Sequence, residues 1–236
     1  MKRYSWISLI LAAGLLLSCT TGPDSQEPES PSPHPTKAQP VDLFNGETLD
    51  GWTAFLVEPD VQKEDVWSVN DGVLVCKGEP LGYLYTEAHY TSFKLLVEWR
   101  WAPDTEPGNS GVLMRISGEP RGVPRAIEAQ LKSGSAGDLY GFHGLKINGA
   151  EERKMGALGH ELLGDFVGVR KTEAKENDPG QWNTYEITLD GSNLTVNVNG
   201  IRVNEAHEAE VLAGPIGLQS EGGEIHFRKV QLTPLD

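Results

Sequence analysis

The stretch that decides the fold is Asn109-Ser110-Gly111-Val112-Leu113-Met114-Arg115, followed by Ile127-Glu128-Ala129-Gln130-Leu131 and Asp138-Leu139-Tyr140-Gly141-Phe142. Its apolar runs alternate with the period of two that is typical of β-strands. Leu113 and Arg115 fall on one side of the first run, and Glu128 and Gln130 share one side of the second. The pattern predicts two strands with polar groups on an exposed sheet face. Such a face is either a ligand site or a solvated surface with cross-strand pairs.

Strand patterns continue through the rest of the chain from about residue 41. Long alternating runs occupy residues 93–101 and 185–198. No amphipathic helix of ten or more residues is evident. In the last strand the apolar phase shifts between Phe227 and Val230, which predicts a β-bulge. Turn signals that favour hairpins separate the runs: Asn70-Asp71-Gly72, Asp190-Gly191 and Asn199-Gly200. The fold class predicted is an all-β sandwich or jelly roll.

Residues 143–181 interrupt this regularity. The segment is rich in glycine and charge, and it shows little strand pattern. A segment of this length without structure of its own is unusual in a compact domain, and long loops are often functional. We therefore expect a loop that walls one side of a cleft.

The amino end carries the features of a bacterial lipoprotein. Lys2 and Arg3 precede an apolar run that is too short to span a membrane, and the run ends at Leu16-Leu17-Ser18-Cys19. The predicted division is a signal peptide at 1–18, a lipidated Cys19 with a Pro/Ser-rich tether at 19–40, and a folded domain at 41–236. These features predict a lipid anchor at Cys19, and a periplasmic or cell-surface location at the bacterial envelope.

Charge and motifs exclude several classes of function. The 236-residue chain has 34 acidic and 20 basic residues and a formal net charge of −14, which argues against binding nucleic acid. No glycine-rich nucleotide motif occurs, so no nucleotide cofactor is predicted. No set of residues has metal-ligand spacing, and no metal ligand is assigned. A requirement for a divalent metal is left open.

A set of polar residues, many next to glycine, remains as candidates for ligand contacts. His143 is an acid–base candidate or a loop histidine with satisfied hydrogen bonds, and Arg228 is a ligand contact or one half of a surface ion pair. The set consists of Ser110 and eleven candidate site residues: Asn109, Arg115, Glu128, Gln130, Lys132, Asp138, Tyr140, His143, Gln219, Glu221 and Arg228.

The order of several short motifs resembles the 3-keto-disaccharide hydrolase domain family, long catalogued as a domain of unknown function. The resemblance covers about residues 42–236. It rests on these motifs: Phe44-Asn45-Gly46, Leu49-Asp50-Gly51-Trp52, Asn109-Ser110-Gly111-Val112, Ile127-Glu128-Ala129-Gln130-Leu131, Ala136-Gly137-Asp138-Leu139-Tyr140, Gln181-Trp182-Asn183, Val198-Asn199-Gly200, Ile216-Gly217-Leu218-Gln219 and Phe227-Arg228. Many members have Leu-Gln-Asp-His-Gly where this chain has Leu218-Gln219-Ser220-Glu221-Gly222, so a histidine of the family is Glu221 here.

The resemblance implies a concanavalin-like jelly roll of two curved antiparallel sheets with a ligand site on the concave face. It also implies a hydrolase, or possibly a lyase, that cleaves 3-keto-glycosides and 3-keto-disaccharides outside the cytoplasm. A ketone at C3 acidifies the proton at C2, so elimination followed by hydration is the expected route. That route needs a base, an acid and a group that stabilises an enolate oxygen.

The catalytic candidates for this route are Glu128 and His143 as base and acid and Arg115 at the enolate oxygen, alone or with Lys132. The side chains expected to bind substrate are Asn109, Gln130, Lys132, Asp138, Tyr140, Gln219, Glu221 and Arg228. Two other functions fit the sequence: a carbohydrate-binding module without catalysis, and a structural or adhesion lipoprotein.

Overall fold

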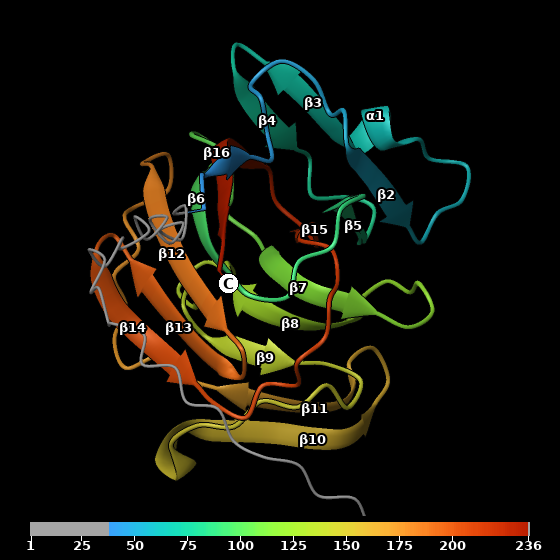
Figure 1. Ribbon diagram of the computed structural model, residues 1–236. Coiled ribbons are helices and arrows are strands. Elements are labelled where there is room, and N and C mark those ends of the chain that lie inside the picture. Colours follow the sequence, from blue (N-terminus) through green and yellow to red (C-terminus); the bar gives the residue numbers. More distant parts are fainter. Residues whose placement is uncertain (1–37, 236) are drawn as a thin grey trace, which may run out of the picture. The chain divides into compact units, whose positions relative to one another are not determined.

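The computed structural model describes residues 38–235. The predicted signal peptide at 1–18, the lipidation site Cys19 and nearly all of the tether at 19–40 lie outside the described residues. Two eight-stranded antiparallel sheets account for almost all of the regular structure that is described (Figure 1). The prediction of an all-β sandwich is therefore confirmed.

The first sheet has the strand order β14-β13-β12-β6-β16-β4-β3, with β1 paired to β16. Its strands are β1 (Val41–Asp42), β3 (Trp67–Asn70), β4 (Val73–Cys76), β6 (Phe93–Trp101), β12 (Asn183–Asp190), β13 (Asn193–Val198), β14 (Ile201–Ala206) and β16 (Ile225–Pro234). The register of β16 against β6 shifts between Phe227 and Lys229, which confirms the predicted bulge.

The second sheet has the order β10-β11-β9-β8-β7-β15-β5-β2. Its strands are β2 (Trp52–Leu56), β5 (Gly82–Thr86), β7 (Gly111–Ser117), β8 (Arg125–Gln130), β9 (Leu139–Gly141), β10 (Lys154–His160), β11 (Gly164–Val169) and β15 (Gly217–Ser220). The stretch that opened the sequence analysis therefore supplies three adjacent strands, β7, β8 and β9, in the middle of this sheet.

Local sequence explains the hairpins. At the β3–β4 turn Asp71 and Gly72 have φ angles of 50° and 78°, and at the β13–β14 turn Asn199 and Gly200 have 51° and 79°. Asn, Asp and Gly tolerate this left-handed conformation, which tight hairpins require. Helical structure in the described residues is limited to the four-residue helix α1 (Lys63–Val66) and the short 3₁₀ helix η1 (Glu151–Arg153). No helix among residues 38–235 has the length and apolar character of a membrane span.

The prediction that residues 143–181 form one long loop is wrong. They contain η1 and the β10–β11 hairpin, which extends the second sheet past β9. Strand β10 is mostly exposed and lies at the edge of the sheet. Because it packs little against the core, its sequence lacks the apolar alternation that reveals a half-buried strand.

The core lies between the sheets. Val112, Met114, Ile127, Ala129 and Leu218 of the second sheet turn inward and are fully buried against the first sheet. Their neighbours along each strand, which include Leu113, Glu128 and Gln219, therefore project from the opposite face. We call this face, which turns away from the first sheet, the outer face of the second sheet. Among the candidate residues, it carries Glu128, Gln130, Tyr140 and Gln219.

Candidate active site

Glu128 is the most deeply buried carboxyl on the outer face of the second sheet, with 1% of its surface exposed. It pairs with Leu113 on β7 and with Tyr140 on β9. Its side chain leans across β7, because a β-carbon added to Gly111 would stand 2.0 Å from the Glu128 Oε1 atom. Glycine at position 111 therefore leaves the space that this carboxyl occupies. The expectation that Glu128 lies on an exposed face is wrong.

The surroundings of Glu128 favour its neutral form. Burial raises the pKa of this carboxyl well above its usual value of 4.5, and the negative charge of Glu221 raises it further. Its Oε1 atom is buried and has no hydrogen-bond partner. A buried carboxylate without a donor is costly, whereas a protonated carboxyl avoids the burial of a charge.

Glu221 stands on the turn that joins β15 to β16, and two other backbone segments fix this turn. Gly222 donates its N–H to the carbonyl of Gly78 and accepts a hydrogen bond from the N–H of Asn109. A β-carbon at Gly78 would lie 2.3 Å from the Gly223 oxygen, and one at Gly108 would lie 1.9 Å from the Gly222 oxygen. Such close backbone approach is possible only for glycine. The position of Glu221 is therefore set by segments distant in sequence.

The environment of Glu221 differs from that of Glu128. The pKa of Glu221 is also raised, chiefly by burial, but the side-chain amides of Asn109 and Gln219 and the positive charge of Lys132 act in the opposite direction. Donors and a cation stabilise the ionised carboxylate, and Glu128 has neither. Five of the eleven candidate residues, Asn109, Glu128, Lys132, Gln219 and Glu221, are thus brought together.

Three oxygen atoms in this cluster lack a donor. Asn109 Oδ1, Glu128 Oε1 and Gln219 Oε1 are buried and unpaired. The strand order β8-β7-β15 explains their proximity, since Glu128 reaches over Gly111 and the hydroxyl of the adjacent Ser110 donates to the Gln219 carbonyl at 2.8 Å. The cluster is therefore short of hydrogen-bond donors.

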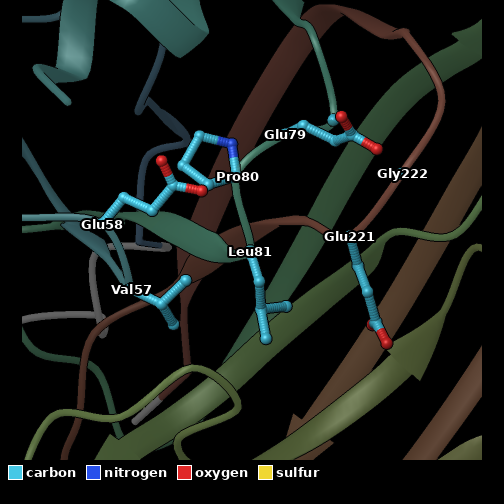
Figure 2. Close-up of a pocket in the computed structure, with 8 residues that line it drawn as sticks. Val57, Glu58, Glu79, Pro80, Leu81, Glu221 and Gly222 are labelled. Atoms are coloured by element: carbon cyan, nitrogen blue, oxygen red, sulfur yellow. The ribbon is translucent and has the colours of Figure 1, made fainter.

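A cleft of about 640 Å³ opens beside Glu221. In Figure 2 the side chains of Leu81 and Glu221 project in the same direction from neighbouring segments, and Glu58 and Glu79 lie on either side of Pro80. Sequence reasoning missed the walls of this cleft, because they lie in loops that carry no strand pattern. The residues that line it are Val57, Glu58, Gly78, Glu79, Pro80, Leu81, Glu221 and Gly222.

The β7–β8 loop (residues 118–124) lies across the outer face. The backbone of Arg121 lies close to the hydroxyl of Tyr83 on β5, and Gly122 packs so closely that a β-carbon there would lie 2.8 Å from Leu81. On the other side of the face, the Nε2 atom of His143 lies 2.9 Å from the Val123 carbonyl. Leu113, on the central strand β7, is fully buried and packs with Tyr83 and Ala126.

His143 therefore anchors a loop. Its Nε2 atom donates to Val123, and its Nδ1 atom lies 3.2 Å from the Arg121 guanidinium, which requires Nδ1 to accept. Partial burial lowers the pKa of His143, and Arg121 lowers it further. Both ring nitrogens of the neutral imidazole are thus engaged. The structure does not bring His143 into the Glu128–Glu221 cluster.

Arg115 does not lie where its sequence position suggested. It has a φ angle of 54°, and the register of β7 against β8 shifts between Met114 and Ser117. This irregularity ends the simple alternation with Leu113. The guanidinium is fully buried and donates to the backbone carbonyls of Thr91, Gly191 and Glu210. The expectation of an exposed guanidinium is therefore wrong, because its donors hold three loops together.

The remaining candidates surround the cluster or lie elsewhere. Gln130 is buried, not exposed as expected, and its Oε1 atom accepts from the N–H groups of Leu131 and Lys132, which fixes the start of the segment that carries Lys132. Asp138 accepts from the Lys171 N–H at 2.8 Å. Tyr140 stacks on Phe142 with ring centroids 5.7 Å apart, next to Glu128 on the outer face.

Arg228 belongs to the first sheet. It pairs with Glu98 and lies over the ring of Trp182, 4.5 Å from its centroid, with Arg100 at the same distance from that ring. The structure therefore places Arg228 in a surface cluster of charged residues away from Glu128. Among residues 38–235, no group of three or more His, Cys, Asp or Glu side chains is arranged to hold a metal ion.

Solved structures with the same fold include carbohydrate-active proteins. A proposed glycosyl hydrolase from Parabacteroides distasonis matches with a TM-score of 0.61 and 20% identity, over 84% of this chain and 94% of that one. The β-glucanase of Bacillus licheniformis matches with a TM-score of 0.53 and 11% identity, over 86% of this chain and 100% of that one. The carbohydrate-binding module CBM66 of Bacillus subtilis matches with a TM-score of 0.54 and 12% identity, over 77% of this chain and 94% of that one. At these identities the likeness shows the jelly-roll fold.

No curated protein sequence matches the chain significantly. A family model described as the 3-keto-alpha-glucoside-1,2-lyase-like domain matches residues 39–233, which is nearly the whole of the described sandwich. The match confirms the resemblance drawn from the motifs around Glu128 and Gln219. The chain therefore belongs to the 3-keto-alpha-glucoside-1,2-lyase-like domain family.

Proposed function

We propose that this protein cleaves the glycosidic bond of 3-keto glycosides at the cleft that Glu221 lines. The observation that carries the proposal is the pair of unlike glutamates: a buried Glu128 without a donor lies near a Glu221 that two amides and a lysine surround. Two carboxyl groups whose environments differ in this way are typical of acid–base sites. Family membership supports a sugar with a ketone at C3 as substrate.

The chemistry of such a sugar fits the cluster. A ketone at C3 makes the C2 proton acidic, a carboxylate removes it, and the enolate then expels the group at C1. Water adds to the resulting double bond and completes a net hydrolysis. Lys132 replaces Arg115 as the cation for the enolate oxygen, because Lys132 faces Glu221 and the Arg115 donors are occupied. The amide of Asn109, which is partly exposed, is suited to orienting a sugar hydroxyl.

The proposed location is the bacterial envelope, with the chain anchored by lipid at Cys19. The charged, apolar and small-residue regions that precede Cys19 support this proposal. Mass spectrometry of the mature amino terminus tests it directly. A Cys19 that carries acyl chains and a Cys19→Ser variant that leaves the membrane fraction are expected, and an unmodified mature chain would refute the anchor.

Turnover of a 3-keto glucoside with a chromogenic leaving group tests the activity. The wild type is compared with the double variant Glu128→Gln/Glu221→Gln and with the control Glu186→Gln, which changes an exposed glutamate of the first sheet. Release of the leaving group by the wild type and the control, and its loss from the double variant, is the expected result. A parallel assay with EDTA decides whether a divalent metal is required.

A second function, sugar binding without catalysis, has one observation in its favour. Tyr140, Phe142 and Phe166 form an aromatic group on the outer face, with centroids 5.7 and 6.3 Å from the Tyr140 ring. Aromatic rings of this kind often contact sugars, and the fold also occurs in a binding module. Calorimetric sugar binding by a wild type that releases no leaving group would favour this alternative.

A further inference from the structure

The sequence predicted Glu128 and His143 as the acid–base pair, but the structure favours different roles for the residues of the site. We propose that Glu221 is the catalytic carboxylate of the cleft and that Glu128 is a positioning residue, which holds a proton behind it at neutral pH. This inference rests on the proposed function, because it assigns the residues that perform the proposed reaction.

Access to the cleft separates the two glutamates. Glu221 lines the cleft and is partly exposed, so its carboxylate can meet a substrate there. Glu128 is 1% exposed and lies beneath the outer face, with its Oε1 atom over Gly111. A group that exchanges protons with a substrate must come within hydrogen-bond reach of it. In this arrangement Glu221 meets that requirement and Glu128 does not.

The balance of hydrogen-bond donors and acceptors around the two glutamates favours a proton on Glu128. The side-chain amides of Asn109 and Gln219 lie beside Glu221 and favour its ionised form. The neighbouring oxygens Asn109 Oδ1, Gln219 Oε1 and Glu128 Oε1 are all acceptors that lack a donor. A proton on Glu128 converts one of these three acceptors into a donor, and so relieves part of the imbalance.

The groups that surround the pair agree with this placement. Tyr140 lies beside Glu128 on the outer face, Glu221 is the charged group that acts on it, and neither supplies a positive charge. Lys132 faces Glu221. Burial and the Glu221 charge raise the pKa of Glu128 well above its usual value, in the direction that keeps the proton on this residue.

A single carboxylate can complete the reaction. Glu221 takes the proton from C2, and the electron pair of that C–H bond forms the enolate at C3. As the C3 carbonyl re-forms, the pair becomes the C1–C2 double bond, and the C1–O bond breaks with its electrons on the leaving oxygen. That oxygen takes the proton from Glu221. Water then attacks C1, gives a proton to Glu221, and Glu221 returns a proton to C2, so that the residue ends as it began.

The two roles predict opposite responses to amide substitution. Glutamine resembles a protonated glutamate in shape and charge, so Glu128→Gln should keep kcat/KM within about tenfold of the wild type, whereas Glu221→Gln should lower it by about 10²–10⁴. Glu186→Gln serves as the unaffected control. The reverse result, with a folded but inactive Glu128→Gln and an active Glu221→Gln, would overturn the assignment.

Infrared spectroscopy tests the position of the proton without the need for turnover. At neutral pH the wild type should show a carboxylic-acid absorption that Glu128→Gln removes and Glu221→Gln retains. If Glu221→Gln removes it instead, the proton is on the wrong residue and the inference fails. If Glu128→Gln does not fold, ¹³C NMR of wild-type protein labelled at glutamate should still reveal one glutamate that stays protonated at neutral pH. A wild type that cleaves no 3-keto glycoside overturns the proposed function and the catalytic role of Glu221. In that case the infrared and NMR measurements still decide whether Glu128 holds the proton.

Discussion

The Glu128 carboxyl lies over Gly111 on the neighbouring strand, at a site where an added β-carbon would stand 2.0 Å from Oε1. The two residues are not paired in the register of β7 and β8, in which Glu128 opposes Leu113 and Gly111 opposes Gln130. The contact arises because the long side chain leans diagonally across a strand that has no side chain at that point. It brings the carboxyl toward β15, where Gln219 and the turn with Glu221 lie.

This contact makes Gly111→Ala a direct probe of the Glu128 position. The new methyl group should displace the carboxyl, lower kcat/KM and cost about 1–3 kcal/mol of unfolding free energy, as overpacking commonly does. Gly217→Ala is the matched control on β15, since its β-carbon would meet the flexible Ile116 side chain at 2.8 Å. Chemical denaturation and steady-state kinetics measure both. Equal kinetics for the two variants would contradict a functional role for the leaning carboxyl.

The turn that carries Glu221 should be equally sensitive to a methyl group at Gly108. The β-carbon of Gly108→Ala would lie 1.9 Å from the Gly222 oxygen, so the turn must move away. We expect kcat/KM to fall by at least about tenfold, because small displacements of catalytic groups have large effects on rate. The crystal structure of the variant would reveal the shift. An unchanged rate with a displaced turn would argue against Glu221 as the reacting group.

Arg115 should matter for stability and not for chemistry. Arg115→Met leaves the carbonyls of Thr91, Gly191 and Glu210 without their donor, which should cost about 2–4 kcal/mol of unfolding free energy. At temperatures where the variant is folded, kcat should be close to that of the wild type. Arg202→Met, at an exposed position, is the control. A variant of normal stability without activity would restore the catalytic role that the sequence suggested.

The raised pKa of Glu128 predicts a pH dependence of stability. Below the usual carboxyl pKa of 4.5, Glu128 is protonated in both the folded and unfolded states and carries no penalty. As pH rises above 4.5, the unfolded chain loses this proton while the folded chain keeps it, so the wild type loses stability relative to Glu128→Gln. The slope should approach about 1.4 kcal/mol per pH unit until the folded pKa is reached. Urea denaturation between pH 4 and 8 measures it, and parallel curves for the two proteins would contradict it.

His143 should behave as an anchor of the β7–β8 loop. His143→Ala removes the contact with the Val123 carbonyl and should cost about 1 kcal/mol of unfolding free energy. The loss of kcat should stay below the 10²–10⁴-fold effect that removal of a general acid or base typically produces. His89→Ala, an exposed histidine before β6, is the control. A drop in kcat of a hundredfold or more, without loss of stability, would reinstate His143 as an acid–base residue.

Sequence alone determined the fold class, the hairpin turns, the bulge in β16 and the family. These features rest on local patterns, because a period of two and a turn that needs positive φ are written in neighbouring residues. The exposed edge strand β10 was not predicted, because its sequence has too few buried apolar residues to show the alternation of a half-buried strand. The residues gathered around Glu128 were also selected from the sequence, as polar groups on otherwise apolar strands.

Tertiary structure alone decided which of those polar residues meet. The positive φ at Arg115 broke the alternation that would have placed it beside Leu113, and the β7–β8 loop engaged both nitrogens of His143. The close approach of Gly78 and Gly108 to Gly222 set Glu221 beside the cleft. The approaches to Gly222 join segments more than a hundred residues apart. No local pattern encodes any of these contacts, because they depend on how two twisted sheets and their loops pack together.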